Sequence, residues 1–400
     1  MEREPIKYED ISRLYYRLFR TMGILPSSSS RRTTLLRVYF HVTIVLYYSM
    51  SMFDGLRMLG HNDIEIEYVF EEVVIHGICA RFLILSCRRE ELAELLLSCE
   101  KLWRMLKPGE DRVVKSYEKI ARYLAHYITW TTLVAIFFYI VAARIVKLPP
   151  AEVNGTERRM LPFRFYVDVQ RQPWYDIVTV LEIVVVLNIA MIVSTIETTG
   201  PFLITMACGY LRSIRNRLLA IADEAEGRGE ISRLSTIRVV SCVKFHQKIM
   251  RFCQDIEKLT SSVLLVQVVC TAYNISLVGF RILKNDPNAV KFVPLLLLNL
   301  LQLFTAQWIP EHLLSETMAF RQSKAIANAA YSASLLHPEY EPRANRALLF
   351  VMLRANRPVQ ITAGGYMKLS LETFKRMLTS ALSFFTVLRS INDGAGDEGE

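Results

Sequence analysis

Long hydrophobic stretches alternate with shorter polar ones along this chain. Four stretches contain no Asp, Glu, Lys or Arg, namely residues 38–53, 123–143, 259–280 and 292–310. The last three are 19 to 22 residues long, the length of helix that crosses the roughly 30 Å hydrocarbon core of a bilayer. The pattern therefore predicts an all-α, polytopic membrane protein.

Extended over weaker segments, the same pattern predicts seven transmembrane helices. The second is the weakest, because Glu71, Glu72 and Arg81 interrupt it. Near the inner end of the fourth, Pro201 is expected to bend or break the helix. The seven predicted spans are residues 35–58, 67–87, 122–146, 175–203, 258–283, 290–311 and 369–391.

Other stretches have a helical pattern without enough apolar length to span a membrane. Residues 88–120, 208–256 and 312–362 are expected to extend the spans into the cytoplasm and pack together there as an anchor. Residues 7–24 have one hydrophobic face, which fits equally a helix on the membrane surface or one packed beneath the bundle. The predicted organisation is a cytoplasmic helix and hinge (1–33), six spans with their loops (34–311), anchor helices (312–362), the seventh span (363–392) and a short extracellular tail (393–400).

Composition agrees with a membrane protein. Hydrophobic residues make up 52% of the 400 residues and charged residues 22%, and the mean hydropathy is +0.24. A soluble chain usually carries more charge. The net charge of +9 is then best interpreted as basic loops held at the cytoplasmic face, with no nucleic-acid partner.

The distribution of Lys and Arg predicts the orientation. The charged N-terminal segment lacks the apolar core of a signal peptide, so we expect it in the cytoplasm. Residues 88–120 contain eight Lys or Arg and residues 209–254 contain nine, against five in the proposed outside loop 147–172. With seven spans the C-terminus is then outside, opposite to a G-protein-coupled receptor. The glycosylation sequon at Asn154 falls in the proposed outside loop.

The motifs of enzymes and metal sites are missing from the sequence. The seven histidines have no metal-ligand spacing, and there is no nucleotide-binding or nucleophile-elbow motif. The seven cysteines all fall in spans or proposed cytoplasmic segments, as free thiols would. We therefore expect no catalytic residues, no cofactor and no bound metal.

Motifs in the last eighty residues resemble those of the insect odorant receptor family, as do looser matches at 16–26, 207–209 and 246–252. Together the matches extend over essentially the whole chain. The C-terminal motifs are, in order, SKAIANAAY at 323–331, LLFVMLRANRP at 348–358, ITAGG at 361–365, LSLETF at 369–374 and SFFTVLR at 383–389.

This resemblance implies a subunit of an odorant-gated, non-selective cation channel. Such subunits form heterotetramers with a shared odorant co-receptor in the plasma membrane of olfactory neuron dendrites, and the seventh span lines the pore. By position, Val387 and Ile391 would form a hydrophobic constriction, with Ser390 facing the ion path. Phe384 and Arg389 depart from the co-receptor's pattern, which favours a ligand-binding subunit.

The resemblance also implies where a small volatile ligand would bind. Such a ligand needs a small apolar cavity, expected in the outer half of the bundle. Tyr273 is expected to supply a hydroxyl group there, although residues of these types in a span also fit ordinary packing. The apolar candidates are Phe70 and Val74 on the second span, Phe138 and Ala142 on the third, and Leu187 and Met191 on the fourth.

Two alternatives remain open from the sequence. A gustatory-type receptor channel of the same superfamily is disfavoured by Ser383-Phe384 and Ser390-Ile391, which differ from that family's ending. A secondary transporter would use Glu182 and Glu197 to couple ions, although no internal repeat or pair of broken helices supports it.

Overall fold

The computed structural model describes residues 8–22, 31–61, 66–145, 173–228, 233–283, 289–321 and 359–380, with Ser383 and Thr386. In these ranges a short antiparallel hairpin, β1 (Thr362–Ala363) and β2 (Met367–Lys368), precedes a helix over residues 371–380. The long helices are α1 (Tyr8–Thr21), α2 (Arg31–His61), α3 (Ile66–Cys87), α4 (Arg89–Trp103), α5 (Glu110–Ile145), α6 (Trp174–Arg228), α7 (Arg233–Leu283) and α8 (Ala289–Arg321).

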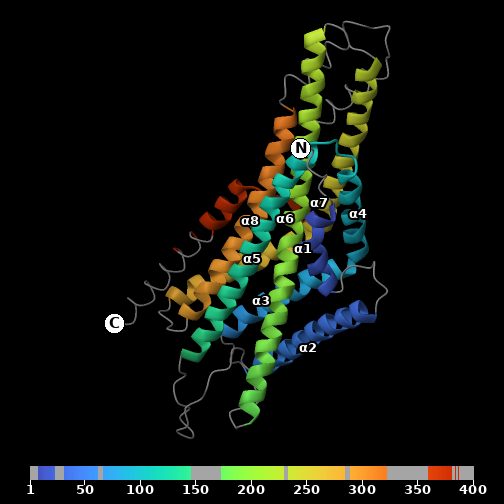
Figure 1. Ribbon diagram of the computed structural model, residues 1–400. Helices are drawn as coiled ribbons and strands as arrows, with labels where there is room; N and C mark the ends of the chain where they lie inside the picture. The colour runs from blue at the N-terminus through green and yellow to red at the C-terminus, as the bar shows by residue number, and fades with distance from the viewer. Residues whose placement is uncertain are drawn as a thin grey trace.

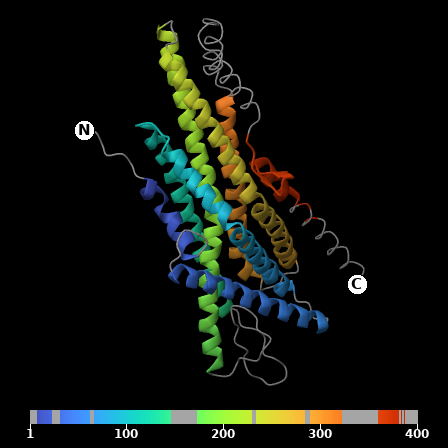
Figure 2. The same ribbon diagram turned by 90° about the vertical axis from the view of Figure 1, so that its right-hand side faces the viewer.

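The long helices form an elongated bundle (Figure 1). Helix α6 runs along almost the whole length of the bundle, and α5 packs along it. Helix α8 contacts both α5 and α6, while α7 packs against α3, α6 and α8. Turned by 90°, the bundle shows α2 crossing the other helices obliquely at one end (Figure 2).

The predicted all-α, polytopic architecture is confirmed. The first six predicted spans fall, in order, in the observed helices α2, α3, α5, α6, α7 and α8. Only the third predicted span extends beyond its helix, by one residue. Among the described residues, the segments Trp174–Ala220, Val240–Gly279 and Val293–Ala319 are long and apolar enough to cross a membrane. In the seventh predicted span, residues 381–391 lie outside the described residues except for Ser383 and Thr386.

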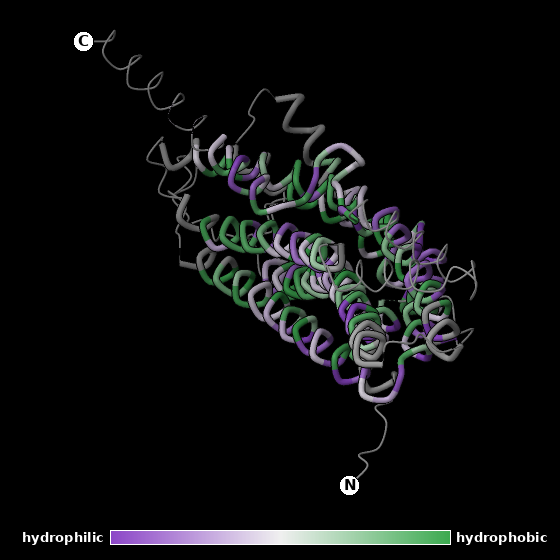
Figure 3. The backbone as a smooth tube through the Cα atoms, turned by 90° about the horizontal axis from the view of Figure 1, so that it is seen from above, coloured by the Kyte–Doolittle hydropathy of each residue, from purple (hydrophilic) through white to green (hydrophobic). Residues whose placement is uncertain are grey.

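The stretches between the spans are largely helical where the structure describes them. Helix α4 and the start of α5 cover most of 88–120, with a turn over 104–109, and α6 and α7 continue through most of 208–256 without a break at the predicted membrane boundary. Figure 3 shows hydrophobic turns dominating one part of the bundle and hydrophilic turns more frequent in another. The polar extensions of α6 and α7 are therefore continuous with the apolar helices.

Pro201 does not end the fourth predicted span, since α6 continues beyond it to Arg228. A proline lacks the backbone N–H that would bond the carbonyl four residues earlier, and tertiary packing can hold a helix together despite that loss. One turn later, Thr205 Oγ1 donates a hydrogen bond of 2.6 Å to the Pro201 carbonyl within the same helix. Phe202 and Ile204 are buried on the same turn. Packing therefore holds the helix continuous.

The amphipathic helix α1 packs against the bundle, which decides between the two interpretations of residues 7–24. The Tyr15 ring stacks on Phe202 of α6 with ring centroids 3.8 Å apart. Phe19 and Met22 are buried as well. The hydrophobic face of α1 is thus covered by protein.

Many large apolar side chains point away from the bundle. Val42 on α2, Trp130 on α5 and Val180 on α6 are all exposed in the isolated chain. Apolar patches of this extent are rare on soluble monomers. They suit a surface that faces lipid or another subunit.

Candidate functional site

A cavity of about 110 Å³ lies between helices α3, α5, α6, α7 and α8. Half of its wall is aliphatic, because α3, α5, α6 and α8 turn branched apolar residues toward it. Polar side chains interrupt this wall on α3, α5, α7 and α8. The aliphatic lining consists of Val74, Ile75, Ile78, Ile136, Val186, Ile189, Val193, Leu295 and Leu298.

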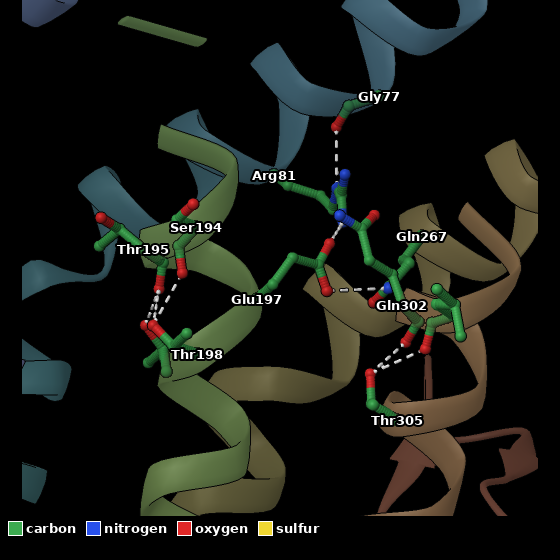
Figure 4. A network of polar contacts seen from close by, with 11 residues as sticks. Gly77, Arg81, Ser194, Thr195, Glu197, Thr198, Gln267, Gln302 and Thr305 are labelled. Carbon is green, nitrogen blue, oxygen red and sulfur yellow. Dashed lines mark hydrogen bonds and ion pairs between the residues drawn. The ribbon is translucent and has the colours of Figure 1, made fainter. Parts of the chain in front are cut away.

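A buried ion pair borders the cavity at one side. The guanidinium of Arg81, on α3, donates a hydrogen bond to the Glu197 carboxylate on α6. Arg81 Nε also donates to the Gly77 carbonyl at 3.3 Å, and Gln267 Nε2, on α7, donates to Glu197 Oε2 at 3.0 Å (Figure 4). Three helices are therefore joined by one polar network.

A second, smaller cavity of about 40 Å³ shares part of this network. Glu197 and Gln267 line it, together with Pro201 of α6 and Pro310 of α8. Gln267 lines both cavities. The ion pair thus forms part of a partition between the two spaces.

Two amide side chains of the larger cavity have unused hydrogen-bonding atoms. Asn274 on α7 and Gln302 on α8 are 1% and 5% exposed. Asn274 Oδ1 and Gln302 Nε2 have no hydrogen-bond partner. By contrast, Thr132 Oγ1 donates to the Ile128 carbonyl at 2.7 Å.

A glycine brings α3 and α7 close together beside the cavity. A Cβ atom on Gly77 would lie 2.7 Å from Cys270 Sγ, closer than real side chains approach. The absence of a side chain at Gly77 therefore sets how closely these two walls meet.

Residues 73–382 match the model of the family described as 7tm Odorant receptor. That match spans most of the chain. The protein belongs to the 7tm odorant receptor family. It is also 23% identical to Odorant receptor 10 of Aedes albopictus over 88% of this chain and 92% of that one. Against Odorant receptor 2a of Drosophila melanogaster it is 21% identical, over 97% and 98%.

The fold of this odorant receptor resembles a solved insect olfactory receptor. OR5 from Machilis hrabei superposes with a TM-score of 0.71 and 14% sequence identity, over 96% of this chain and 99% of that one. The same receptor has also been solved in complex with eugenol, again with a TM-score of 0.71. The family membership confirms an odorant receptor and excludes an enzyme.

The predicted ligand-binding residues of the odorant receptor divide into three groups. Val74 lines the cavity. The side chains of Phe70, in α3, and Ala142, in α5, lie outside the described residues. The other four are 39% to 53% exposed and lie outside the set that lines the cavity: Phe138, Leu187, Met191 and Tyr273.

On α6, the predicted ligand-binding residues and the observed lining residues lie on different faces of the helix. Leu187 follows Val186 directly, and successive helical positions are about 100° apart. Val186 and Ile189 line the cavity whereas Leu187 points outward. Polar residues within apolar spans, such as Asn274 and Gln302, were the stronger sequence signal for the inner face.

The remaining predicted sites receive no test from the geometry. The gate residues Val387, Ser390 and Ile391 and the sequon at Asn154 all lie outside the described residues. Among the described residues, no group of three or more His, Cys, Asp or Glu side chains is placed to hold a metal ion.

The transporter alternative loses one of its two supports. Glu197, which was a candidate for ion coupling, is held in the network with Arg81 and Gln267. Glu182 is buried on α6. Membership in the odorant receptor family favours a receptor over a transporter.

Proposed function

We propose that this odorant receptor is the ligand-binding subunit of an odorant-gated, non-selective cation channel. It binds a small volatile organic molecule in the cavity and opens the channel in complex with the shared odorant co-receptor, as a heterotetramer in the plasma membrane. The observation that carries this proposal is the cavity itself, an aliphatic space of about 110 Å³ bordered by five helices. An apolar cavity of about 150 Å³ is known to bind benzene.

A structure of a related receptor supports the binding of a small organic ligand. The related OR5 has been solved in complex with the small molecule eugenol. Our chain shares the fold of that receptor along nearly its whole length. We propose a ligand smaller than eugenol here, since the cavity of about 110 Å³ is no larger than one that binds benzene.

The proposed topology places the N-terminus in the cytoplasm and the C-terminus outside the cell. Its support is the crowding of Lys and Arg in the segments that would face the cytoplasm. The extensions of α6 and α7 would then form part of the cytoplasmic anchor. In this arrangement the Asn154 sequon is extracellular and available for glycosylation.

The proposed gate lies in the seventh span. Val387 and Ile391 close the pore by excluding water, and Ser390 faces the ion path between them. A hydrophobic constriction that opens by wetting needs no charged filter, which fits poor discrimination among cations.

A contact route joins the cavity to the start of this span. Glu257 of α7 accepts a hydrogen bond of 2.8 Å from the Thr362 amide in β1. The Gly364 amide donates to the Ser261 carbonyl of α7 at 3.0 Å. Gln307 Nε2 of α8 lies 3.6 Å from Met377 Sδ. Helices α7 and α8 both line the cavity, so a ligand that shifts them can act on the seventh span directly.

Recording ligand-evoked currents with and without an insect odorant co-receptor tests the proposal. We expect currents carried by Na⁺ and K⁺ alike, only when both subunits are expressed. Robust currents from this chain alone would instead indicate the gustatory-type channel. Surface delivery of both chains without any current to a broad set of volatiles would contradict the channel proposal.

A further inference from the structure

Two residues of the cavity wall each carry a buried polar atom without a hydrogen-bond partner, one an acceptor and the other a donor. Asn274 Oδ1 and Gln302 Nε2 are buried and have no partner. They come from α7 and α8, the two helices that also contact the β1–β2 hairpin and residue Met377. Buried polar groups are normally paired, so these two atoms are suited to a partner that enters the cavity.

Several other polar side chains around the cavity already have hydrogen-bond partners. Asn299 Nδ2 donates to the Leu295 carbonyl at 2.8 Å, and Thr132 is bonded to its own helix. Gln267 and Arg81 are occupied by Glu197. Asn274 and Gln302 therefore offer a buried acceptor and a buried donor to a ligand that enters the cavity.

We infer that this receptor selects small ligands bearing a hydroxyl group, namely alcohols or phenols close to the size of benzene. A hydroxyl can donate to Asn274 Oδ1 and can accept from Gln302 Nε2, so it is the one simple functional group that can pair with either amide. The inference rests on the proposed function, because it assumes that the cavity is the odorant site.

Other ligand classes leave at least one amide unpaired. An ether or carbonyl oxygen accepts from Gln302 Nε2 and offers nothing to Asn274 Oδ1. A hydrocarbon satisfies neither atom and displaces any water that bridged them. Sites that hydrogen-bond a ligand hydroxyl reject the analogue without it strongly, because buried polar groups are then left unpaired.

The experiment compares phenol, toluene and anisole, which share one ring and differ in the polar group. Concentration–response curves are recorded on cells that express the receptor with the co-receptor. We expect phenol to act at a concentration at least tenfold lower than toluene or anisole. Thermal stabilisation of the purified receptor by the same compounds gives a second readout that needs no gating.

Variants then assign the preference to the two amides. Asn274→Leu should bring phenol and anisole to the same potency, because only the Gln302 donor remains. Asn274→Leu combined with Gln302→Leu should remove the advantage of phenol over toluene. The control is Asn188→Leu, an amide on α6 that donates to the Tyr39 hydroxyl at 2.7 Å outside this cavity. It should keep the tenfold preference.

The outcomes separate this inference from the proposed function. Equal potency of the three compounds in the wild-type receptor overturns the hydroxyl preference and leaves the cavity as the odorant site. A phenol preference that persists in the double variant also overturns it. Absence of both current and stabilisation with all three compounds contradicts the cavity as the odorant site, and the inference fails with it.

Discussion

Arg81 on α3 and Glu197 on α6 form a buried ion pair beside the cavity, although 116 positions separate them in the chain. Their side chains are only 8% and 5% exposed. Breaking a buried pair leaves the other charge without compensation, which costs far more than removing both charges. The pair therefore ties the second and fourth spans together.

Removing one partner of this pair should destabilise the receptor. We expect Arg81→Met or Glu197→Met alone to cost about 3–5 kcal/mol, and the double variant to recover much of that loss. Thermal unfolding of the purified receptor measures the effect. Arg104→Met is the control, since the Arg104–Glu100 pair lies on the surface and is worth about 0–1 kcal/mol. Wild-type stability of both single variants would contradict the assigned role.

Gly77 should tolerate no side chain. Because its Cβ would lie 2.7 Å from Cys270 Sγ, we expect Gly77→Ala to cost about 1–3 kcal/mol through overpacking. Adding Cys270→Ala should relieve part of the clash. A Cβ atom on Gly200 would instead have its nearest neighbour 3.9 Å away, so Gly200→Ala should be neutral or stabilising. Thermal unfolding of the purified variants and their surface delivery in cells measure the effect. Equal stability of Gly77→Ala and Gly200→Ala would refute the close-packing argument.

The sequence predicted the spans because their hydrophobic stretches are long and nearly free of charge. It did not predict that α6 would continue through Pro201, since the burial of Phe202 and Ile204 in the bundle cannot be read from the local sequence. Nor did it identify the partner of Arg81, which appeared only as an interruption of the second span. Pairing across 116 positions depends on how α3 and α6 pack, and periodicity carries no such information.

Arg217 should resist replacement even by lysine. It donates from Nε to Glu110 Oε1 at 2.6 Å, from Nη2 to the Met105 carbonyl at 3.0 Å, and lies over the Phe245 ring. Lysine cannot reproduce this forked geometry. We expect Arg217→Lys to cost about 1–3 kcal/mol, seen as a lower unfolding temperature. Arg104→Lys, at an exposed pair, should change little, and an equal effect at both positions would refute this role for Arg217.

The proposed gate predicts a gain of resting current. Val387→Ser removes apolar surface worth about 1–2 kcal/mol, which is comparable to the bias of a dewetting constriction. Unliganded current should rise while surface delivery is kept, and Val387→Ile, which stays apolar, should keep it low. Because the proposed channel also contains the co-receptor, the equivalent position of that subunit must be changed in parallel. Wild-type resting current in Val387→Ser, Ile391→Ser and the combined variants would exclude these residues from the gate.

The candidate site was predictable at the level of helices rather than of side chains. Val74, which the sequence proposes as a ligand-binding residue, lies in the cavity wall, and the predicted third and fourth spans contribute to that wall. Apolar residues alone do not show which helix face is inward, because the outward face meets lipid and is apolar too. The sequence therefore could not show that Leu187 is exposed while Val186 beside it is buried.

These two neighbours provide the most direct test that the cavity is the odorant site. Val186→Phe places a ring in the cavity, whereas Leu187→Phe adds the same ring on the exposed face of α6. The measurement is the concentration–response curve of an activating volatile, with the co-receptor present and surface delivery matched. We predict that Val186→Phe abolishes the response or weakens it at least tenfold, and that Leu187→Phe leaves it within about threefold of wild type. An unchanged response in Val186→Phe, or loss in Leu187→Phe alone, would contradict the account.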